Sequence, residues 1–515
     1  MNKKRIVIIL MLIAIASKAV GFLREVTLSY FWGATNISDA YLISTTIPTT
    51  IFTFVGAGIT TGFIPIYTEI KEKKGSILSN EFINKLFWST QLICLLMIVL
   101  GEVFCGQLVK IFASGFDQET YYIALKFTRV SLFEIGFTTL MYILTAYLQS
   151  ESAFIPAALA SFPMNLMTIT AIILSSGGNY YFLCIGCLAA SFAQAFFLVP
   201  FAFRKGLKIV RVHGVFSDKS IKDMFLLALP TIIGTSVNDI NVLVDRTLAS
   251  NITVGGISSL NYAGKINALL QGIIVLSIVS YVYPKFSHLA VQKKKNELKG
   301  VINEAVVTIA FLLLPATVFI LFYCKEVVSI VFGRGAFDED AIIMTSSVLF
   351  GYTIGMIANG LREVFSRILF AFKNSKTPMI NGVLGMIVNI ILNLVLSKFL
   401  GIAGLALATS ISSFFILVLL IIAVIHKGHW KPDRAFVRSI IKITVLSFLL
   451  FVAIYLFRLF INSVFPNLNI YIALVLSFVV GAAIYIIGAF VIKIREITSF
   501  ISFIKNRPVG KQDEN

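Results

Sequence analysis

The sequence predicts an all-α protein that crosses a membrane many times, and three observations lead to this fold class. Of its 515 residues, 58% are hydrophobic, and the mean hydropathy is +0.91. Only 13% are charged, whereas soluble domains carry about 25% charged residues. The apolar residues gather in runs of about 20, the length that a helix needs to cross a bilayer. No soluble fold could bury so much apolar surface.

These runs predict about fourteen membrane-spanning helices. The first run is longer than the apolar core of a signal peptide, so we expect it to remain as the first span. Long linkers and low-complexity stretches are missing from the sequence, so we expect no separate soluble domain. The expected spans lie near residues 6–31, 40–68, 86–110, 120–148, 154–175, 179–203, 223–249, 257–284, 303–324, 342–371, 378–398, 403–426, 439–461 and 470–492.

The positive charge of the chain, formally +18, falls mainly on one side of the expected membrane. With the N-terminus in the cytoplasm, the inner segments hold about 29 of the 43 lysines and arginines, the outer loops about 5 and the spans about 9. Cytoplasmic loops of membrane proteins carry such an excess. The sequence therefore predicts a multi-pass protein with both termini in the cytoplasm. The excess charge is explained by topology and by contacts with anionic membrane lipids, so we expect no nucleic-acid partner.

Three landmarks recur in the same order and indicate a duplicated helix bundle. The duplication predicts two six-helix lobes in parallel orientation, at residues 1–205 (spans 1–6) and 206–427 (spans 7–12). Spans 13 and 14 and a cytoplasmic tail make up residues 428–515. Parallel repeats of this kind place a substrate site between the lobes, near the middle of the membrane. The matching landmarks are Pro65 with Pro284, Pro156 with Pro378, and Gly186 with Gly404.

Ionisable residues interrupt the apolar spans. Lys18, Arg24 and Glu25 lie in the first span, and Lys265 lies deep in the eighth. A charge near the bilayer centre costs roughly 2.5–3.5 kcal/mol on insertion scales, so such residues usually face a protein interior or a watery cavity. Lys18 and Lys265 are too far from either end of their spans to snorkel. Buried salt bridges are the alternative to a functional cavity, and the sign of the charges predicts an anionic cargo.

Two further ionisable residues stand near or inside the spans. Asp39 opens the second span, where it would either cap the helix or balance Arg24. Arg246 is a cation inside the seventh span. Both are candidates for the same charged interior.

Sequence motifs of enzymes are missing. Neither the phosphate-binding G-x-x-x-x-G-K-[ST] loop nor the zinc motif H-E-x-x-H occurs. Cys184 and Cys187 form a C-x-x-C without a second pair or a nearby histidine, which favours packing over metal binding. We therefore expect a transporter and not an enzyme.

Several stretches resemble the lipid II flippase family (MurJ/MviN), which belongs to the multidrug/oligosaccharidyl-lipid/polysaccharide exporter superfamily. They are SKAVGFLREVTLSYFWGATNISDAYLISTTIP, GFIPIYTE, DRTLAS…GGISSLNYAGKI and VFGRGAFD. The resemblance implies fourteen spans in two lobes, with a central cavity whose basic residues hold a lipid-linked pyrophosphate. Lys18 stands where the family commonly has arginine, Arg24 and Asp39 match the family, and Lys265 replaces another cavity arginine. The resemblance thus implies that these four residues bind the cargo.

One stretch departs from the family. Where the family's second span typically carries an arginine pair and then Glu-Gly, residues 49–59 read TTIFTFVGAGI and hold no charge. Lysine at two cavity positions also lacks the bidentate fork that suits phosphate oxygens. These departures leave open a cargo other than lipid II.

The resemblance also implies a sodium site. The matching positions are Asp245 on the seventh span, Asn389 and Asn393 on the eleventh, and Thr409 on the twelfth. The two asparagines are four residues apart and share a helix face, and oxygen ligands suit a hard cation. Asn393 replaces a carboxylate of the family. Hydrogen bonding between helices is the alternative role. We expect no resident cofactor, with Na⁺ as a candidate coupling ion.

The function that the resemblance implies is a flippase of a bacterial cytoplasmic (inner) membrane. It would move an undecaprenyl-pyrophosphate-linked peptidoglycan precursor, lipid II, from the inner to the outer leaflet by alternating access. Its partners would be this lipid-linked anion, membrane lipids and cell-wall synthesis proteins. Three other hypotheses stay open: a flippase for another lipid-linked oligosaccharide, a cation-coupled drug or metabolite antiporter, and a non-transporting scaffold.

Overall fold

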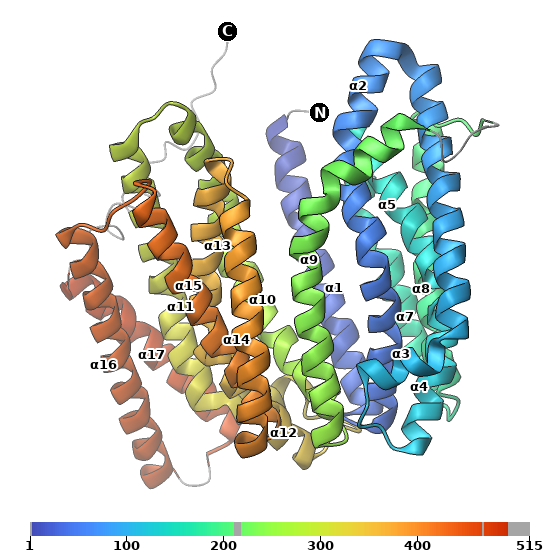
Figure 1. Cartoon of the computed structure of the whole chain (residues 1–515). Coiled ribbons are helices and arrows are strands. Elements are labelled where there is room, and N and C mark those ends of the chain that lie inside the picture. Colours follow the sequence, from blue (N-terminus) through green and yellow to red (C-terminus); the bar gives the residue numbers. More distant parts are fainter. Residues whose placement is uncertain (1–2, 211–217, 466–467, 493–515) are drawn as a thin grey trace. The chain divides into compact units, whose positions relative to one another are not determined.

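The computed structural model describes residues 3–210, 218–465 and 468–492 (Figure 1). These residues form helices, with no strand among them. Nine of the described helices are long and apolar enough to span a membrane, or up to twelve if each of three bent pairs is one span. The predicted all-α, multi-pass fold class is confirmed, and the count of fourteen spans stays a prediction.

Packing divides the chain into two compact units. The first unit combines residues 1–265 with residues 332–344, and the second combines residues 266–331 with residues 345–515. This division follows contacts, whereas the predicted lobe boundaries follow the sequence repeat. The boundaries after residues 205 and 427 therefore stay predictions.

The first unit holds most of the N-terminal helices. Its long helix α2 covers the predicted second span and most of the third, in two arms that meet at a kink at Gly75 (Figure 1). Gly75 has φ +84°, in the left-handed region that only glycine adopts without strain. The helices are α1 (Lys3–Trp32), α2 (Asn36–Val103), α3 (Cys105–Phe112), α4 (Gln118–Ser131), α5 (Glu134–Ser150), α6 (Phe154–Leu159), α7 (Ser161–Ser175), α8 (Tyr181–Arg204), α9 (Lys219–Ile252) and the start of α10 (Gly256–Val291).

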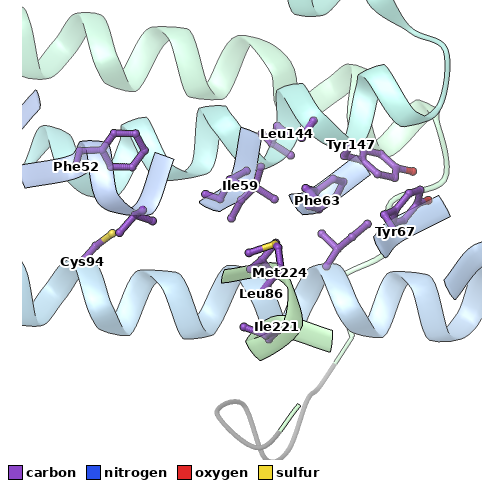
Figure 2. Packing of buried hydrophobic residues seen from close by; sticks show 14 of the residues in the cluster. Phe52, Ile59, Phe63, Tyr67, Leu86, Cys94, Leu144, Tyr147, Ile221 and Met224 are labelled. Atoms are coloured by element: carbon purple, nitrogen blue, oxygen red, sulfur yellow. The ribbon is translucent and has the colours of Figure 1, made fainter. Parts of the chain in front are cut away.

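A cluster of buried side chains joins α2 to its neighbours. Figure 2 shows side chains from both arms of α2, from α5 and from α9 meeting in this cluster. Small residues allow the close approach, because a Cβ added at Gly62 would lie 2.8 Å from the Met224 carbonyl oxygen. Between helices in lipid, such close van der Waals packing replaces the hydrophobic effect as the source of stability.

The second unit contains the rest of α10 and the C-terminal helices. Its last two helices are tied to α11 by polar contacts, since Arg458 donates to Glu326 Oε1 at 2.9 Å and Tyr323 Oη lies 2.7 Å from Ser477 Oγ. The helices are α11 (Lys295–Phe332), α12 (Glu339–Ile354, which begins in the first unit), α13 (Met356–Ala371), α14 (Lys376–Leu400), α15 (Ile402–His426), α16 (Arg434–Val464) and α17 (Ile470–Ile492).

Matching bends support the predicted duplication. The pair α4 and α5 is bent by 41°, and the pair α12 and α13 by 42°. The first break lies at residues 132–133. If its position is shifted by the spacing between the matched Pro156 and Pro378, it corresponds to residues 354–355. The second break falls there, between Ile354 and Met356. Each half of the chain therefore repeats the same broken span.

Candidate functional site

A cavity of about 480 Å³ lies inside the first unit, between α1, α2, α5, α7, α8, α9 and the first turns of α10. Four threonines of α2, at positions 45, 46, 49 and 50, supply hydroxyl groups to its wall. Two of them belong to the stretch that carries no charge. Among the described residues, the ionisable bases and carboxyls that line it are Arg24, Glu25, Glu134, Asp239, Arg246 and Lys265.

Glu25 lies between two cations of this cavity. Its carboxylate accepts a hydrogen bond from Arg24 Nη2 at 2.7 Å and another from Asn261 Nδ2 at 2.9 Å. Lys265 Nζ lies 3.4 Å from the same carboxylate. Glu25 is only 3% exposed, and a buried charge of this kind persists only when it is paired and hydrogen-bonded. The carboxylate therefore holds both cations at the cavity wall.

Arg246 brings a third cation from α9. It donates to the Leu42 carbonyl oxygen at 2.6 Å and to the Thr46 hydroxyl, both on α2. The second span, whose own residues 49–59 are uncharged, thus has an arginine of α9 bound to it. α9 thus supplies a cation beside the part of α2 that lines the cavity.

Asp39 lies outside the cavity wall, where it caps a different helix. It accepts hydrogen bonds from the Gly255 and Ser258 backbone N–H groups at 2.8 and 2.7 Å, and from Ser258 Oγ at 2.6 Å. These N–H groups stand at the start of α10, where a helix has no internal acceptors for them. The interpretation of Asp39 as the cap of its own helix is wrong, because Thr35 is the N-cap of α2. Its predicted contact with cargo stays a prediction.

The structure separates the four predicted cargo-binding residues. Arg24 and Lys265 line the cavity, whereas Lys18 is exposed on α1 and is not part of the wall. Lys265 also forms a salt bridge, with Glu25, and a buried salt bridge was the alternative to a functional cavity. Glu25 and Arg246 were expected in the charged interior but not as cargo ligands, and Glu134 was not selected, although all three are charges inside apolar spans. That signal identifies such residues but does not tell which helix face meets a cavity.

The predicted sodium ligands of the second unit lie together. Asn389 Nδ2 donates to Thr409 Oγ1 at 3.3 Å, and Asn393 Nδ2 donates to Asn389 Oδ1 at 2.9 Å. Ser412 joins them at 3.4 Å, a residue that sequence reasoning missed. Both asparagines are buried, and the contacts link α14 to α15. Asp245 belongs to the first unit, so its place in such a site stays a prediction.

Comparison with known proteins identifies the family. The family model described as lipid II flippase MurJ matches residues 28–478. This chain belongs to the lipid II flippase MurJ family. The resemblance inferred from the first span, the second span and the DRTLAS stretch is therefore confirmed.

Relatives in this family share about a quarter of their residues with this chain. A "Probable lipid II flippase MurJ" of Thermotoga maritima is 27% identical over 490 residues, which cover 94% of this chain and 96% of the relative. A protein of the same name from Treponema pallidum is 26% identical over 426 residues, covering 79% and 78%.

Solved structures agree in fold. A lipid II flippase MurJ in an inward closed conformation matches with a TM-score of 0.81 at 25% identity, covering 94% of this chain and 98% of that one. An inward-facing multidrug transporter of the MATE family, in the MOP superfamily, matches with a TM-score of 0.67 at 14% identity, covering 85% and 98%. The second likeness shows the shared fold alone.

Proposed function

We propose that this chain is a flippase that moves lipid II from the inner to the outer leaflet of a bacterial cytoplasmic membrane by alternating access. The observation that carries the proposal is the set of bases around Glu25, where Arg24 and Lys265 line a cavity inside a membrane-embedded unit. Membership of the lipid II flippase family supports the same cargo. Both termini would lie in the cytoplasm, as the distribution of lysine and arginine indicates.

Glu25 acts as a stand-in for the cargo anion. In the absence of cargo its carboxylate pairs with Arg24 and Lys265 and holds their side chains at the wall. A pyrophosphate entering the cavity competes for these cations, with a bidentate contact to the arginine and a point-charge contact to the lysine. Because Glu25 stays close by, it also recovers the cations when the cargo leaves. Binding is therefore an exchange of ion pairs and not the burial of bare charges.

The membrane potential supplies a driving force for this cycle. Moving one elementary charge through 100 mV is worth about 2.3 kcal/mol. An anionic cargo leaves a negative interior favourably, so the potential favours the outward step. Transport would then depend on the potential even without a coupling ion.

The test is transport of labelled lipid II in proteoliposomes that hold the purified full-length protein. We expect Arg24→Ala and Lys265→Ala to lower the flipping rate at least about tenfold, the loss of about 1.4 kcal/mol of cargo interaction. Lys265→Arg should keep activity, which separates a lost contact from misfolding. Lys126→Ala is the matched control, because Lys126 is an exposed lysine of the same unit whose Nζ contacts Tyr181 Oη at 3.0 Å, away from the cavity.

Wild-type rates in Arg24→Ala and Lys265→Ala, with normal insertion, would contradict the cavity assignment. Lys18→Ala belongs in the same series, because Lys18 was predicted to bind cargo but does not line the cavity, and its flipping rate tests that prediction. Competition by lipid-linked oligosaccharides without the peptide would reveal a broader cargo. Absence of flipping by the wild-type protein would favour a scaffold that recruits cell-wall synthesis proteins, and pull-downs would then look for them.

We also propose Na⁺ as a coupling ion bound at Asn389, Asn393 and Thr409, with Asp245 as the charged ligand. Amide and hydroxyl oxygens are suitable ligands for a hard cation, and three of these residues lie together in the second unit. Their mutual hydrogen bonds equally suit a link between helices. A Na⁺ gradient should accelerate flipping relative to K⁺, and Asn393→Ala should remove that acceleration. Equal rates in Na⁺ and K⁺ would leave these residues as a helix link only.

A further inference from the structure

Glu134 is a carboxyl that the proposed cycle does not use. It is the first residue of α5, directly after the break that separates α5 from α4. Its Oε2 atom accepts a hydrogen bond from Ser191 Oγ at 3.4 Å. Its Oε1 atom is buried and has no hydrogen-bond partner among the described residues. The side chain lines the same cavity as the three bases.

The titratable groups around Glu134 come from several helices. Within the described part of the chain, no base forms a salt bridge with it: Arg24 and Lys265 contact Glu25, and Arg246 is bound to α2. On α8, the Cys187 thiol, which lines the same cavity, donates its hydrogen to Tyr41 Oη at 3.2 Å. The titratable groups that share the cavity with Glu134 are Arg24 and Glu25 of α1, Tyr41 of α2, Cys187 of α8, Asp239 and Arg246 of α9, and Lys265 of α10.

This environment suits a neutral carboxylic acid. An ionised carboxylate with one buried oxygen unpaired and no cation in contact is costly in a protein, and such groups take up a proton instead. Glu25 shows the opposite arrangement in the same cavity, because two cations and an amide surround it. The two carboxyls therefore have different roles, and of these two Glu134 is the one arranged to gain and lose a proton.

The proton on Glu134 decides the net charge of the cavity. Among the described residues the wall holds three bases and three carboxyls, so it is neutral when all of them are ionised. With a proton on Glu134 it carries one positive charge. We propose that Glu134 is a proton-binding site of this cavity and that its proton binds together with the anionic cargo. The proposal rests on the proposed function for the identity of that cargo.

Thermodynamic linkage between proton and cargo binding fixes the direction in which cargo affinity changes with pH. If a proton on Glu134 strengthens cargo binding, cargo binding strengthens proton binding by the same factor. A diphosphate esterified at both ends has no group that titrates near neutrality, so the cargo itself adds no pH dependence. Affinity should fall as the pH rises, by up to about tenfold per pH unit for one linked proton.

The first measurement is the affinity of the full-length protein in nanodiscs for lipid II, between about pH 5.5 and 8.5, where a single linked proton gives the slope above. We expect wild-type affinity to fall across this range and Glu134→Gln to hold the low-pH value throughout. The matched control is Glu102→Gln, because Glu102 also has a buried, unpartnered oxygen but lies outside the cavity wall. This control should follow the wild type. The assignment to Glu134 would be overturned if Glu134→Gln kept the wild-type dependence of affinity on pH. It would also be overturned if Asp239→Asn lost that dependence.

The second measurement needs no cargo and separates the two proposals. Infrared difference spectra of the nanodisc protein should show a protonated carboxyl band that disappears with rising pH and is missing in Glu134→Gln. If the wild type binds no lipid II at any pH, the proposed function fails and this band alone decides on the proton site. A band that persists in Glu134→Gln overturns the proton site. A band that added NaCl removes at constant pH also overturns it, in favour of a sodium ion at Glu134.

Discussion

The cavity of the first unit and the polar seam of the second unit (Asn389, Asn393 and Thr409) stabilise their buried polar side chains in different ways. In the cavity, Glu25 is an anion held by Arg24 and Lys265. In the seam, Asn393 and Asn389 are neutral amides: Asn393 donates to Asn389, and Asn389 donates to the Thr409 hydroxyl. A cation paired with a carboxylate can exchange that carboxylate for another anion. A neutral amide carries no charge to exchange, and the bond from Asn389 to Thr409 links two helices.

This difference teaches where transport chemistry can reside. A buried ion pair contributes little net stability, because the cost of removing both charges from water offsets their attraction. Its retention inside a membrane unit therefore indicates exchange with a charged ligand. A neutral seam, by contrast, is explained by packing alone, and a ligand there needs separate support.

The largest effect is expected from removing the anion of the cavity. Glu25→Ala leaves Arg24 and Lys265 facing each other without a counter-charge, and the loss of one partner of a buried pair costs about 3–5 kcal/mol when both groups are fully buried. Since the Lys265 side chain is 41% exposed, we expect about 2 kcal/mol. Denaturant unfolding in detergent measures this loss.

Rescue by an anion distinguishes exchange from simple damage. A soluble diphosphate that is esterified at both ends should restore stability to Glu25→Ala, because it replaces the missing carboxylate between the two cations. The same compound should stabilise a protein damaged elsewhere much less, for example Gly62→Ala, where the added Cβ meets Met224 and Glu25 still competes for the two cations. Equal effects on the two variants would argue against a stand-in role for Glu25.

A smaller effect is expected at Asp39, which is as buried as Glu25 but lies outside the cavity wall. Asp39→Asn loses the charge assistance in its bonds to the Gly255 and Ser258 N–H groups. A hydrogen bond to a charged group contributes about 1.5–3 kcal/mol, and the amide retains part of it, so we expect a loss of about 1–2 kcal/mol. Thermal unfolding should report this loss while the affinity for lipid II, measured at a temperature where the variant is folded, stays within about twofold, which is well under 1 kcal/mol.

The sequence predicted the class of the fold and part of the cavity, for identifiable physical reasons. Apolar runs and the lysine and arginine asymmetry report membrane insertion directly, and a charge such as Arg24 inside a run reports a polar interior. Asn389 and Asn393 were paired correctly, because spacing on one helix is fixed by helix geometry. The partners of Asp39 and Arg246 depend on which helices pack together, and periodicity does not contain that information.

A still smaller effect is expected in the neutral seam. Asn389→Ala removes the acceptor of Asn393 Nδ2 and the donor to Thr409. Hydrogen bonds between membrane helices contribute about 0.6 kcal/mol on average and about 1.7 kcal/mol at most, so we expect a loss of about 1 kcal/mol. The loss should be independent of added diphosphate. A Na⁺-dependent stability in the wild type that disappears in Asn389→Ala would show that the seam binds the ion and is more than a helix link.

The smallest effect is expected at an exposed ion pair of the second unit, which contrasts with the buried pair at Glu25. Lys299 Nζ lies 2.8 Å from Asp433 Oδ2, and Asp433 also accepts from the Phe436 N–H at the start of α16. The Lys299 hydrogen bond, with that of the backbone, holds the pKa of Asp433 below its ordinary value. Because the folded state favours the ionised form, the stabilisation is present at neutral pH and is lost as the pH falls through the pKa of Asp433 in the folded protein. With both side chains about a third or more exposed, the pair is worth about 0.5 kcal/mol. Asp433→Asn should therefore unfold slightly earlier than the wild type at neutral pH and equally at low pH, and a difference that grows on acidification would contradict this assignment.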